Sequence, residues 1–409
     1  MMKYIVLLGD GMADYPLDRL GGKTPLEAAR TPHMDFLARE GILGLVDTIP
    51  QGFKAGSDVA NLSVLGYDPA TCYSGRGPLE AANMGVALGP RDIAFRCNLI
   101  TLGDGGDPTM DDFTAGHITS VEAAEIIASL HDALGNDEFQ FFPGVSYRHL
   151  FVWRNGVAEM QTTPPHDITG QKTNTYLPVG PGSRTAVDMM RLAKDILASH
   201  PVNEARKREG KQTANAVWLW GQGRAPQMVK LTDRYGFRGG VISAVDLLNG
   251  IGVYAGLQPL RVEGATGYTN TNYRGKAERA LVALQDLDFV FVHVEAPDEM
   301  GHEGNLPGKI KAIEDFDNLV VGTVLKGMPG FGAVRILVLS DHPTPISIRT
   351  HAADPSPFAA YSTVENENRS SGRSYGEATA RKAGRLVTPG SDLMDLFISP
   401  GRPFFDKPH

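Results

Sequence analysis

Cysteine is scarce in this sequence. Only Cys72 and Cys97 occur among its 409 residues, too few for the disulfide framework that stabilises small secreted domains. A chain of this length can bury a core that is stable without disulfides, and at ~150 residues per domain it has room for two or three domains. We therefore expect a cytoplasmic protein that folds in a reducing compartment.

Long apolar runs and an excess of positive charge are also missing. No segment approaches the roughly 20 apolar residues of a membrane-spanning helix, and the first apolar run is much shorter than the core of a signal peptide. The net charge of −8 argues against nucleic acid as a partner, although it is compatible with a local anion site. No Gly-x-x-x-x-Gly-Lys-Ser/Thr loop supports nucleotide binding. We expect a soluble protein with a small-molecule ligand and no membrane partner.

The segment Val334–His351 contains the first candidate site residues. It opens with apolar and β-branched residues and then changes to Ser-Asp-His-Pro, which predicts a buried parallel strand that stops before Pro343. Asp341 and His342 would then lie at the carboxyl end of a strand, where α/β sheets bind ligands. With His351 they offer ligands that suit Mn²⁺, Zn²⁺ or Mg²⁺. The alternative is that Asp341 only accepts N–H bonds from the loop.

Two further predicted strands end in acidic residues. Lys3–Leu8 is an apolar run, and the Gly-Asp-Gly turn after it directs Asp10 away from the strand end. Leu287–Val294 is a second such run, and Asp298 and His302 follow it four residues apart, a spacing that places both on one face of a helical turn. The alternative for Asp10 is that it only caps the next helix.

Ser57 precedes an apolar, helix-like run. A serine in the first turn of a helix has backbone N–H groups and the positive end of the helix dipole beside it, so it can face a phosphoryl group. It can equally be a plain N-cap. No base lies nearby in the sequence, but a metal ion would lower the pKa of the hydroxyl instead.

A change of residue composition after Ser74 predicts an inserted domain at residues 76–178. Gly and Asp become frequent, and the short β-like runs Ile93–Thr101 and His149–Trp153 accompany an amphipathic helix at Val121–Leu134. Scattered basic residues are more often solvated than functional. The polar candidates in this domain are Arg76, Arg91, Arg96, His117, Arg148, Arg154, His166 and Asp167.

The remaining residues, 1–75 and 179–409, alternate strand and helix patterns. Ala216–Trp220 and Gly239–Ala244 look like strands of the same sheet as the N-terminal strand. Lys276 stands near the start of a helix that follows a Gly/Asn/Thr-rich loop, either as a phosphate contact or as a solvated residue. We predict an α/β fold with a doubly wound, mostly parallel sheet and a smaller inserted α/β domain.

The candidate ligands fall into two sets, which would hold two divalent ions roughly 3.5–4 Å apart, as enzymes of phosphoryl transfer do. The first set is Asp298, His302 and His351, and the second is Asp10, Asp341, His342 and the oxygen of Ser57.

Several segments resemble the archaeal-type, cofactor-independent phosphoglycerate mutases of the alkaline phosphatase superfamily. They extend from Gly9 to His351 and include Gly-Ser-Asp-Val-Ala-Asn-Leu-Ser-Val-Leu-Gly-Tyr-Asp-Pro, Gly-Arg-Gly-Pro-Leu-Glu-Ala-Ala, Ala-Gly-His-Ile, His-Pro-Val-Asn, Trp-Gly-Gln-Gly, Val-Ile-Ser-Ala-Val-Asp-Leu and Glu-Ala-Pro-Asp-Glu-Met-Gly-His. The resemblance implies an alkaline-phosphatase-like domain interrupted by a smaller transferase domain.

The same resemblance implies roles for individual residues. Ser57 would be phosphorylated during turnover within the two-metal site, and Lys276 would contact the phosphoryl group. His117 matches a substrate-binding histidine of the wider mutase family. The remaining substrate-binding candidates, Arg148, His166 and Asp167, fit the pattern of the inserted domain, and the substrate group that each contacts is open.

We therefore expect interconversion of 3-phosphoglycerate and 2-phosphoglycerate through a phosphoserine. The cofactors would be two divalent ions, with Mn²⁺ preferred over Zn²⁺ or Mg²⁺, and no bisphosphoglycerate. A metal-dependent phosphatase or phosphodiesterase on the same scaffold is one alternative, because fold and metals alone do not decide the acceptor. A non-catalytic sensor of a phosphorylated ligand is another, and a homo-oligomer is compatible with the sequence.

Overall fold

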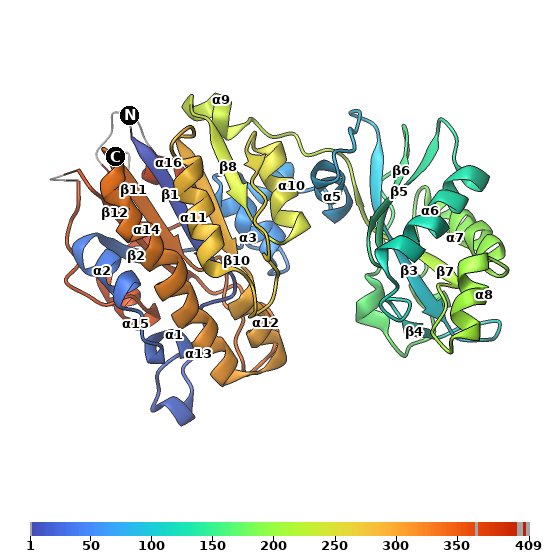
Figure 1. Ribbon diagram of the computed structural model, residues 1–409, viewed down its shortest axis with the longest axis horizontal. Helices are drawn as coiled ribbons and strands as arrows, with labels where there is room; N and C mark the ends of the chain where they lie inside the picture. The colour runs from blue at the N-terminus through green and yellow to red at the C-terminus, as the bar shows by residue number, and fades with distance from the viewer. Residues whose placement is uncertain (1, 365–366, 399–403, 406–409) are drawn as a thin grey trace. The chain divides into compact units, whose positions relative to one another are not determined.

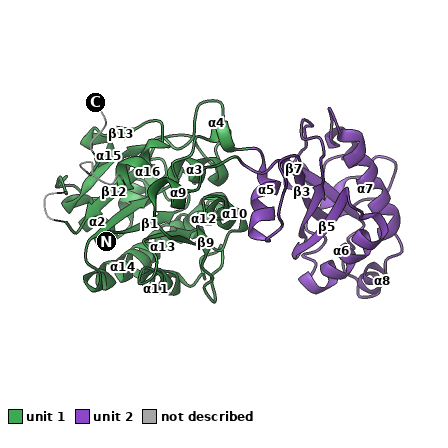
Figure 2. Ribbon diagram, turned by 90° about the horizontal axis from the view of Figure 1, so that it is seen from above, with its two compact units in different colours: residues 1–73, 227–409 green, residues 74–226 purple. Residues whose placement is uncertain are grey.

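The computed structural model describes residues 2–364, 367–398 and 404–405. The chain forms two compact units, which are coloured separately in Figure 2. The first unit contains residues 1–73 and 227–409, and the second unit contains residues 74–226. The second unit is thus an insertion in the first.

The first unit is built on an eight-stranded sheet in the described part of the chain. Its strand order is β13 (Leu386–Val387), β2 (Ile42–Val46), β12 (Ser356–Ser362), β11 (Val334–Leu339), β1 (Lys3–Gly9), β10 (Phe289–Val294), β8 (Gly239–Ile242) and β9 (Gln258–Pro259). The five strands from β11 to β9 run parallel to one another, while β12 is antiparallel to both of its neighbours.

Helices cover both faces of this sheet, as Figure 2 shows. α3 (Ser57–Val64) and α16 (Asp392–Ile398) lie on one face, and α11 (Tyr273–Ala283) and α14 (Gly322–Gly327) lie on the other. Because both faces are covered, the central strands need no polar side, and every residue of β10 and β11 is buried. The predicted doubly wound α/β fold is confirmed.

The three central strands end together at one edge of the sheet. β1 pairs with β10 on one side and with β11 on the other, with Gly9 opposite Val294 and Leu8 opposite Leu339. The residues that follow these strands must therefore meet at one edge. The strands predicted at Lys3–Leu8, Leu287–Val294 and the start of Val334–His351 are confirmed, which explains why their acidic ends converge.

The second unit has an antiparallel sheet and its own core. The described strands are β4 (Met110–Asp112), β3 (Ile93–Leu102), β6 (Arg148–Trp153), β5 (Phe139–Val145) and β7 (Ala216–Gly223), which pairs with β3. The helices α6 (Ser120–Leu134) and α7 (Ser183–Leu197) contribute apolar side chains to the same core. The expected helix at Val121–Leu134 and the strands at Ile93–Thr101 and His149–Trp153 are confirmed.

The expected end of the insertion at residue 178 is wrong. The unit continues to residue 226, because α7 packs into its core and β7 pairs with β3 in antiparallel orientation. The prediction that Ala216–Trp220 belongs to the parallel sheet fails for the same reason. An apolar run shows that a strand is buried on both faces, but it does not show which strand lies beside it.

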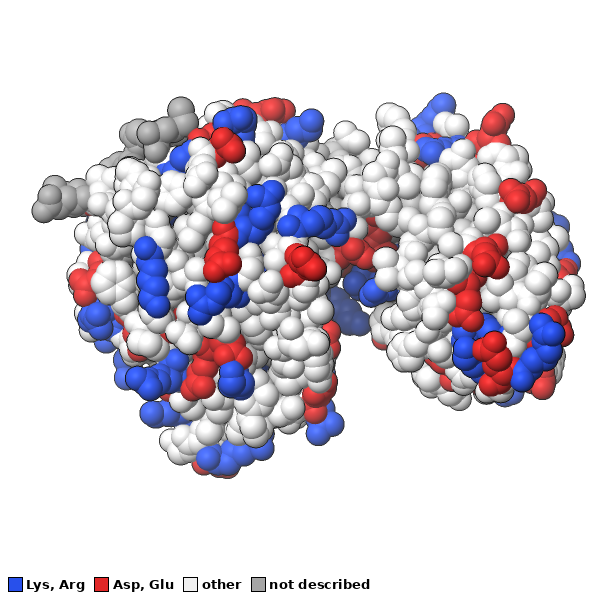
Figure 3. Space-filling model, in the orientation of Figure 1, with Lys and Arg blue, Asp and Glu red and all other residues white. Residues whose placement is uncertain are grey.

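The charge on one face of the molecule and the length of its helices bear on its possible partners. On the face shown in Figure 3, acidic and basic side chains are interspersed with neutral ones, without a continuous basic area. Within residues 2–364, 367–398 and 404–405, no helix has both the length and the apolar character that a membrane crossing requires.

Candidate active site

The set Asp10, Asp341 and His342 converges at the carboxyl edge of the first unit's sheet. All three residues are fully buried, and their potential ligand atoms lie within 4.8 Å of one another. His342 Nε2 is 3.4 Å from Asp10 Oδ1 and 3.6 Å from Asp341 Oδ2. Asp10 Oδ1 is buried without a hydrogen-bond partner among the described residues. A buried carboxylate oxygen that lacks a hydrogen-bond partner is consistent with a cation site at the centre of these three residues.

Ser57 belongs to the same set. Its Oγ is 3.2 Å from His342 Nε2. Gly56 occupies the N-cap position of α3, and Ser57 is the first helical residue, so the alternative that Ser57 serves as the N-cap is wrong. The side chain of Asn61, one turn further along α3, donates hydrogen bonds to Ser57 O and to Asp341 Oδ2, both at 2.8 Å. These bonds tie the start of α3 to the end of β11.

The set Asp298, His302 and His351 also converges. His302 Nε2 is 3.2 Å from Asp298 Oδ2 and 2.9 Å from His351 Nε2, and His351 Nε2 is 3.5 Å from Asp298 Oδ1. Asp298 and His302 share one face of α12 (Ala296–Glu303), as their spacing predicts.

The opposite ring nitrogens of these histidines face backbone carbonyls. His302 Nδ1 lies 3.1 Å from Arg349 O, and His351 Nδ1 lies 3.3 Å from Ala55 O. Because a carbonyl can only accept, each Nδ1 donates its proton to the carbonyl it faces, so the Nε2 atoms beside Asp298 are the ones that could bind a metal ion once they are deprotonated. Two imidazoles and a carboxylate in this arrangement are a suitable ligand set for Mn²⁺ or Zn²⁺.

Gly11 allows the two sets to come close together. Its φ is +57°, in the left-handed region. A Cβ at this position would be 2.4 Å from Asp298 Oδ1 and 2.5 Å from Thr344 Oγ1. Its N–H also donates to Asp341 Oδ1 at 3.1 Å. A side chain here would therefore displace Asp298, a candidate ligand of the set with His302 and His351.

Lys276 is buried next to the strand end and is not a solvated helix residue. Its side chain in α11 has no exposed surface, and its Nζ donates to His293 O at 3.0 Å. Burial lowers the pKa of Lys276 to about 8. A lysine held here by the fold is positioned near the candidate metal ligands, since His293 is itself 2.7 Å from Asp10.

The substrate-binding candidates in the second unit surround shared aromatic rings. The His117 ring is 6.5 Å from the Tyr147 ring, and the Arg148 guanidinium is 5.6 Å from the same ring. His166 lies 5.4 Å from the Trp220 ring, and Asp167 Oδ1 is 3.6 Å from His166 Nε2. Phe113 contacts both groups, with its ring 5.9 Å from Tyr147 and 6.0 Å from His166. The second unit thus gathers these side chains on one surface.

Comparison with known proteins agrees with this arrangement. A family model described as 2,3-bisphosphoglycerate-independent phosphoglycerate mutase matches residues 38–203. A probable mutase of this name from Geobacter sulfurreducens is 54% identical over 97% of this chain and 100% of its own length. One from Methanosarcina barkeri is 53% identical over 97% of this chain and 99% of its own. The chain belongs to this family.

Solved structures agree with the family assignment. The PH0037 protein from Pyrococcus horikoshii is 31% identical with a TM-score of 0.80, and the match covers 97% of each chain. The cofactor-independent phosphoglycerate mutase from Thermoplasma acidophilum is 26% identical with a TM-score of 0.66, and the match covers 97% of this chain and 98% of that one. The fold of this family member is therefore shared along nearly the whole chain.

Two groups of residues near the site of this family member were not predicted from its sequence. His293 and Glu295 lie beside Asp10, and the signal for them was a histidine within an otherwise apolar strand and an acid directly after it. Burial raises the pKa of Glu295 to about 8. The other group supports the ligand loops, since Lys309 Nζ donates to Asp14 Oδ2 and to Thr344 O. Nothing in the local sequence distinguishes Lys309 from a surface lysine.

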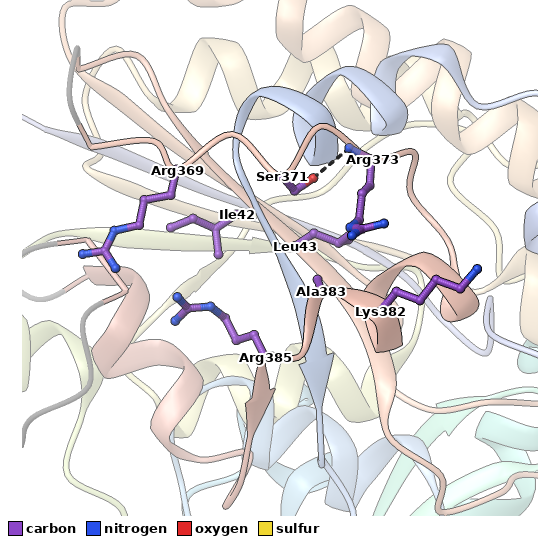
Figure 4. A pocket seen from close by; sticks show the side chains of 8 residues that line it. All are labelled: Ile42, Leu43, Arg369, Ser371, Arg373, Lys382, Ala383 and Arg385. Atoms are coloured by element: carbon purple, nitrogen blue, oxygen red, sulfur yellow. Dashed lines mark hydrogen bonds between the residues drawn. The ribbon is translucent and has the colours of Figure 1, made fainter.

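A separate pocket in the first unit is basic, and Figure 4 shows its side chains around the start of β2. Ile42 and Leu43 begin this strand, which runs in the same direction as β11 because two antiparallel pairings separate them. The pocket therefore lies at the edge of the sheet opposite the candidate metal ligands. Its polar lining consists of Arg369, Ser371, Arg373, Lys382 and Arg385.

Proposed function

We propose that this protein interconverts 3-phosphoglycerate and 2-phosphoglycerate through a phosphoserine at Ser57. The observation that carries the proposal is the position of the Ser57 hydroxyl, 3.2 Å from His342 Nε2, at the start of α3 and beside Asp10 and Asp341. The family to which the chain belongs is named for phosphoglycerate mutase activity.

Two divalent ions, one for each ligand set, would lower the pKa of the Ser57 hydroxyl and neutralise charge on the phosphoryl oxygens. The Ser57 oxygen attacks phosphorus, the bond from phosphorus to the glycerate oxygen breaks, and the glycerate oxygen gains a proton to replace the one that Ser57 loses. Transfer back to the other glycerate hydroxyl restores Ser57. The first-turn amides of α3 and the ammonium of Lys276 stabilise the transferred group.

The second unit supplies the residues that hold glycerate between the two transfers. A mutase must retain glycerate and exclude water, because hydrolysis of the phosphoserine would turn it into a phosphatase. We assign this role to His117, Arg148, His166 and Asp167, whose basic members can bind a carboxylate by charge-assisted hydrogen bonds.

The composition of the ligand sets favours Mn²⁺. Each set mixes imidazole nitrogen with carboxylate oxygen, whereas Mg²⁺ prefers oxygen ligands alone. Burial lowers the pKa of His342, which keeps this imidazole neutral as a ligand must be. The reaction belongs to glycolysis and gluconeogenesis, and we expect it to take place in the cytoplasm.

A coupled assay tests the proposal. The protein is supplied with 3-phosphoglycerate and no bisphosphoglycerate, and 2-phosphoglycerate is detected through its dehydration to phosphoenolpyruvate. Activity should disappear after EDTA treatment and return with Mn²⁺. Isomerisation that survives removal of metal would contradict the metal centre, and release of inorganic phosphate without isomerisation would favour the phosphatase alternative.

A further inference from the structure

A third group of ligand atoms lies beside the two sets already described. Asp10 Oδ2 is 2.7 Å from His293 Nε2, which is 3.4 Å from Glu295 Oε2. The potential ligand atoms of these three residues lie within 4.8 Å of one another. His293 and Glu295 belong to neither ion set, so their convergence needs an explanation of its own.

The register of the strands brings these residues together. His293 is in β10, and Glu295 follows the end of that strand directly. Because Gly9 is opposite Val294, Asp10 at the end of β1 is level with Glu295. Two carboxylates are thus held side by side, with Asp10 fully buried and the Glu295 side chain 15% exposed, and each repels the charge of the other.

No basic side chain of the described residues neutralises Glu295. Its Oε2 is buried and has no hydrogen-bond partner, and no Lys or Arg nitrogen in the described part of the chain is within 4.0 Å of its carboxylate. The nearby Lys276 ammonium donates instead to the backbone oxygen of His293. Asp10 has no exposed surface, and the oxygen that faces this group, Oδ2, lies 2.7 Å from His293 Nε2.

His293 is oriented in the way that a metal-ligating histidine is. Its Nδ1 is 3.1 Å from Ser243 Oγ, at the end of β8. A histidine that ligates through one ring nitrogen usually donates the N–H of the other to an oxygen. A proton on Nδ1 would leave the Nε2 lone pair directed between Asp10 and Glu295.

We propose that Asp10, His293 and Glu295 bind a third divalent cation. Asp10 would share its two oxygens between this ion and the one at Asp341 and His342. One imidazole and two carboxylates suit Mn²⁺ or Zn²⁺. This third site extends the proposed two-ion centre, and it depends on that proposal only because the two share Asp10 as a ligand. Because it shares that ligand, the third ion binds more weakly than the other two and is acquired last.

Metal counting tests this site. Metal-stripped protein is dialysed against increasing Mn²⁺, and bound metal per chain is measured by elemental analysis for the wild type, Glu295→Gln and His293→Gln. The control is Glu299→Gln, the same substitution at a half-buried glutamate of α12 that belongs to none of the three groups. Circular dichroism confirms that each variant is folded.

The expected result is that Glu295→Gln and His293→Gln each bind one equivalent of Mn²⁺ fewer than the wild type, while Glu299→Gln binds as much as the wild type. Equal metal content in the wild type and Glu295→Gln would overturn the site and leave His293 as a hydrogen-bond partner of Asp10. The third site is tested by the difference in bound Mn²⁺ between each variant and the wild type. The two-ion proposal is tested by the wild type alone, and it would be refuted if the wild type bound fewer than two ions per chain. If His293→Gln or Glu295→Gln fails to fold, anomalous scattering from Mn²⁺-soaked wild-type crystals decides, by a peak or its absence among these three residues.

Discussion

Replacing Lys309 by Met should destabilise the first unit and weaken the metal centre. Lys309 lies in α13 (Leu306–Asp315) and has no exposed surface. Its Nζ donates to Ala13 O at 3.1 Å, Asp14 Oδ2 at 2.7 Å and Thr344 O at 2.8 Å. It therefore joins the loop after β1, which carries Asp10, to the loop after β11, which carries His342.

The magnitude follows from burial. Removing one partner of a buried ion pair leaves the other charge uncompensated, which costs about 3–5 kcal/mol. Within the described part of the chain, the Asp14 carboxylate then keeps only its bonds from the backbone N–H groups of Ile346 and Tyr15. At about 2–4 °C per kcal/mol, the melting temperature of the first unit should fall by roughly 6–20 °C. Affinity for Mn²⁺ should fall as well, because both ligand loops lose a common anchor.

Differential scanning calorimetry of the metal-free protein measures the fall in melting temperature. Titration with Mn²⁺ measures the loss of metal affinity. Lys311→Met is the matched control on the same helix. Lys311 pairs with Asp315 at the surface, where its side chain is 67% exposed, and such exposed pairs contribute about 0–1 kcal/mol. Lys309→Met with Asp14→Asn should recover much of the lost stability, because neither buried charge then remains. Equal melting temperatures for Lys309→Met and Lys311→Met would show that the buried contacts of Lys309 do not stabilise the first unit.

Three other predictions concern the site. Ser57→Ala should keep the fold and bound metal but lose isomerisation, and residual activity in the coupled assay would contradict a covalent role. His351→Ala should remove the ion of the Asp298 set and leave the other set occupied, so equal loss of both ions by elemental analysis would show that the ligands are partitioned differently. Arg148→Ala or His117→Ala should raise inorganic phosphate released per isomerisation by roughly tenfold, since a hydrogen bond to a charged group contributes about 1.5–3 kcal/mol. Loss of aryl phosphate hydrolysis in the same proportion as isomerisation would instead make these residues structural.

The ends of the central strands could be predicted because the sequence changes character there. The apolar runs of β1 and β11 stop at Gly-Asp-Gly and Ser-Asp-His-Pro, and a parallel sheet brings such ends to one edge. The four-residue spacing of Asp298 and His302 was likewise sufficient to place them on one face of a helix.

The residues that were missed depend on contacts between distant parts of the chain. Lys309 is 295 positions from Asp14, and His293 is 283 positions from Asp10. Their roles follow from the fold and leave no local pattern. The extent of the second unit was missed for a related reason, because the apolar run of β7 is equally compatible with a parallel sheet and with its actual place beside β3.

Phosphate on Ser57 during turnover is the decisive sign of the proposed phosphoserine mechanism. Protein loaded with Mn²⁺ is mixed with 3-phosphoglycerate alone, quenched in acid after milliseconds, and digested for mass spectrometry. If Ser57 carries the phosphoryl group between the two transfers, phosphorylated Ser57 appears before 2-phosphoglycerate accumulates and decays as the reaction reaches equilibrium. Normal formation of 2-phosphoglycerate with Ser57 unmodified at every time point would contradict this mechanism.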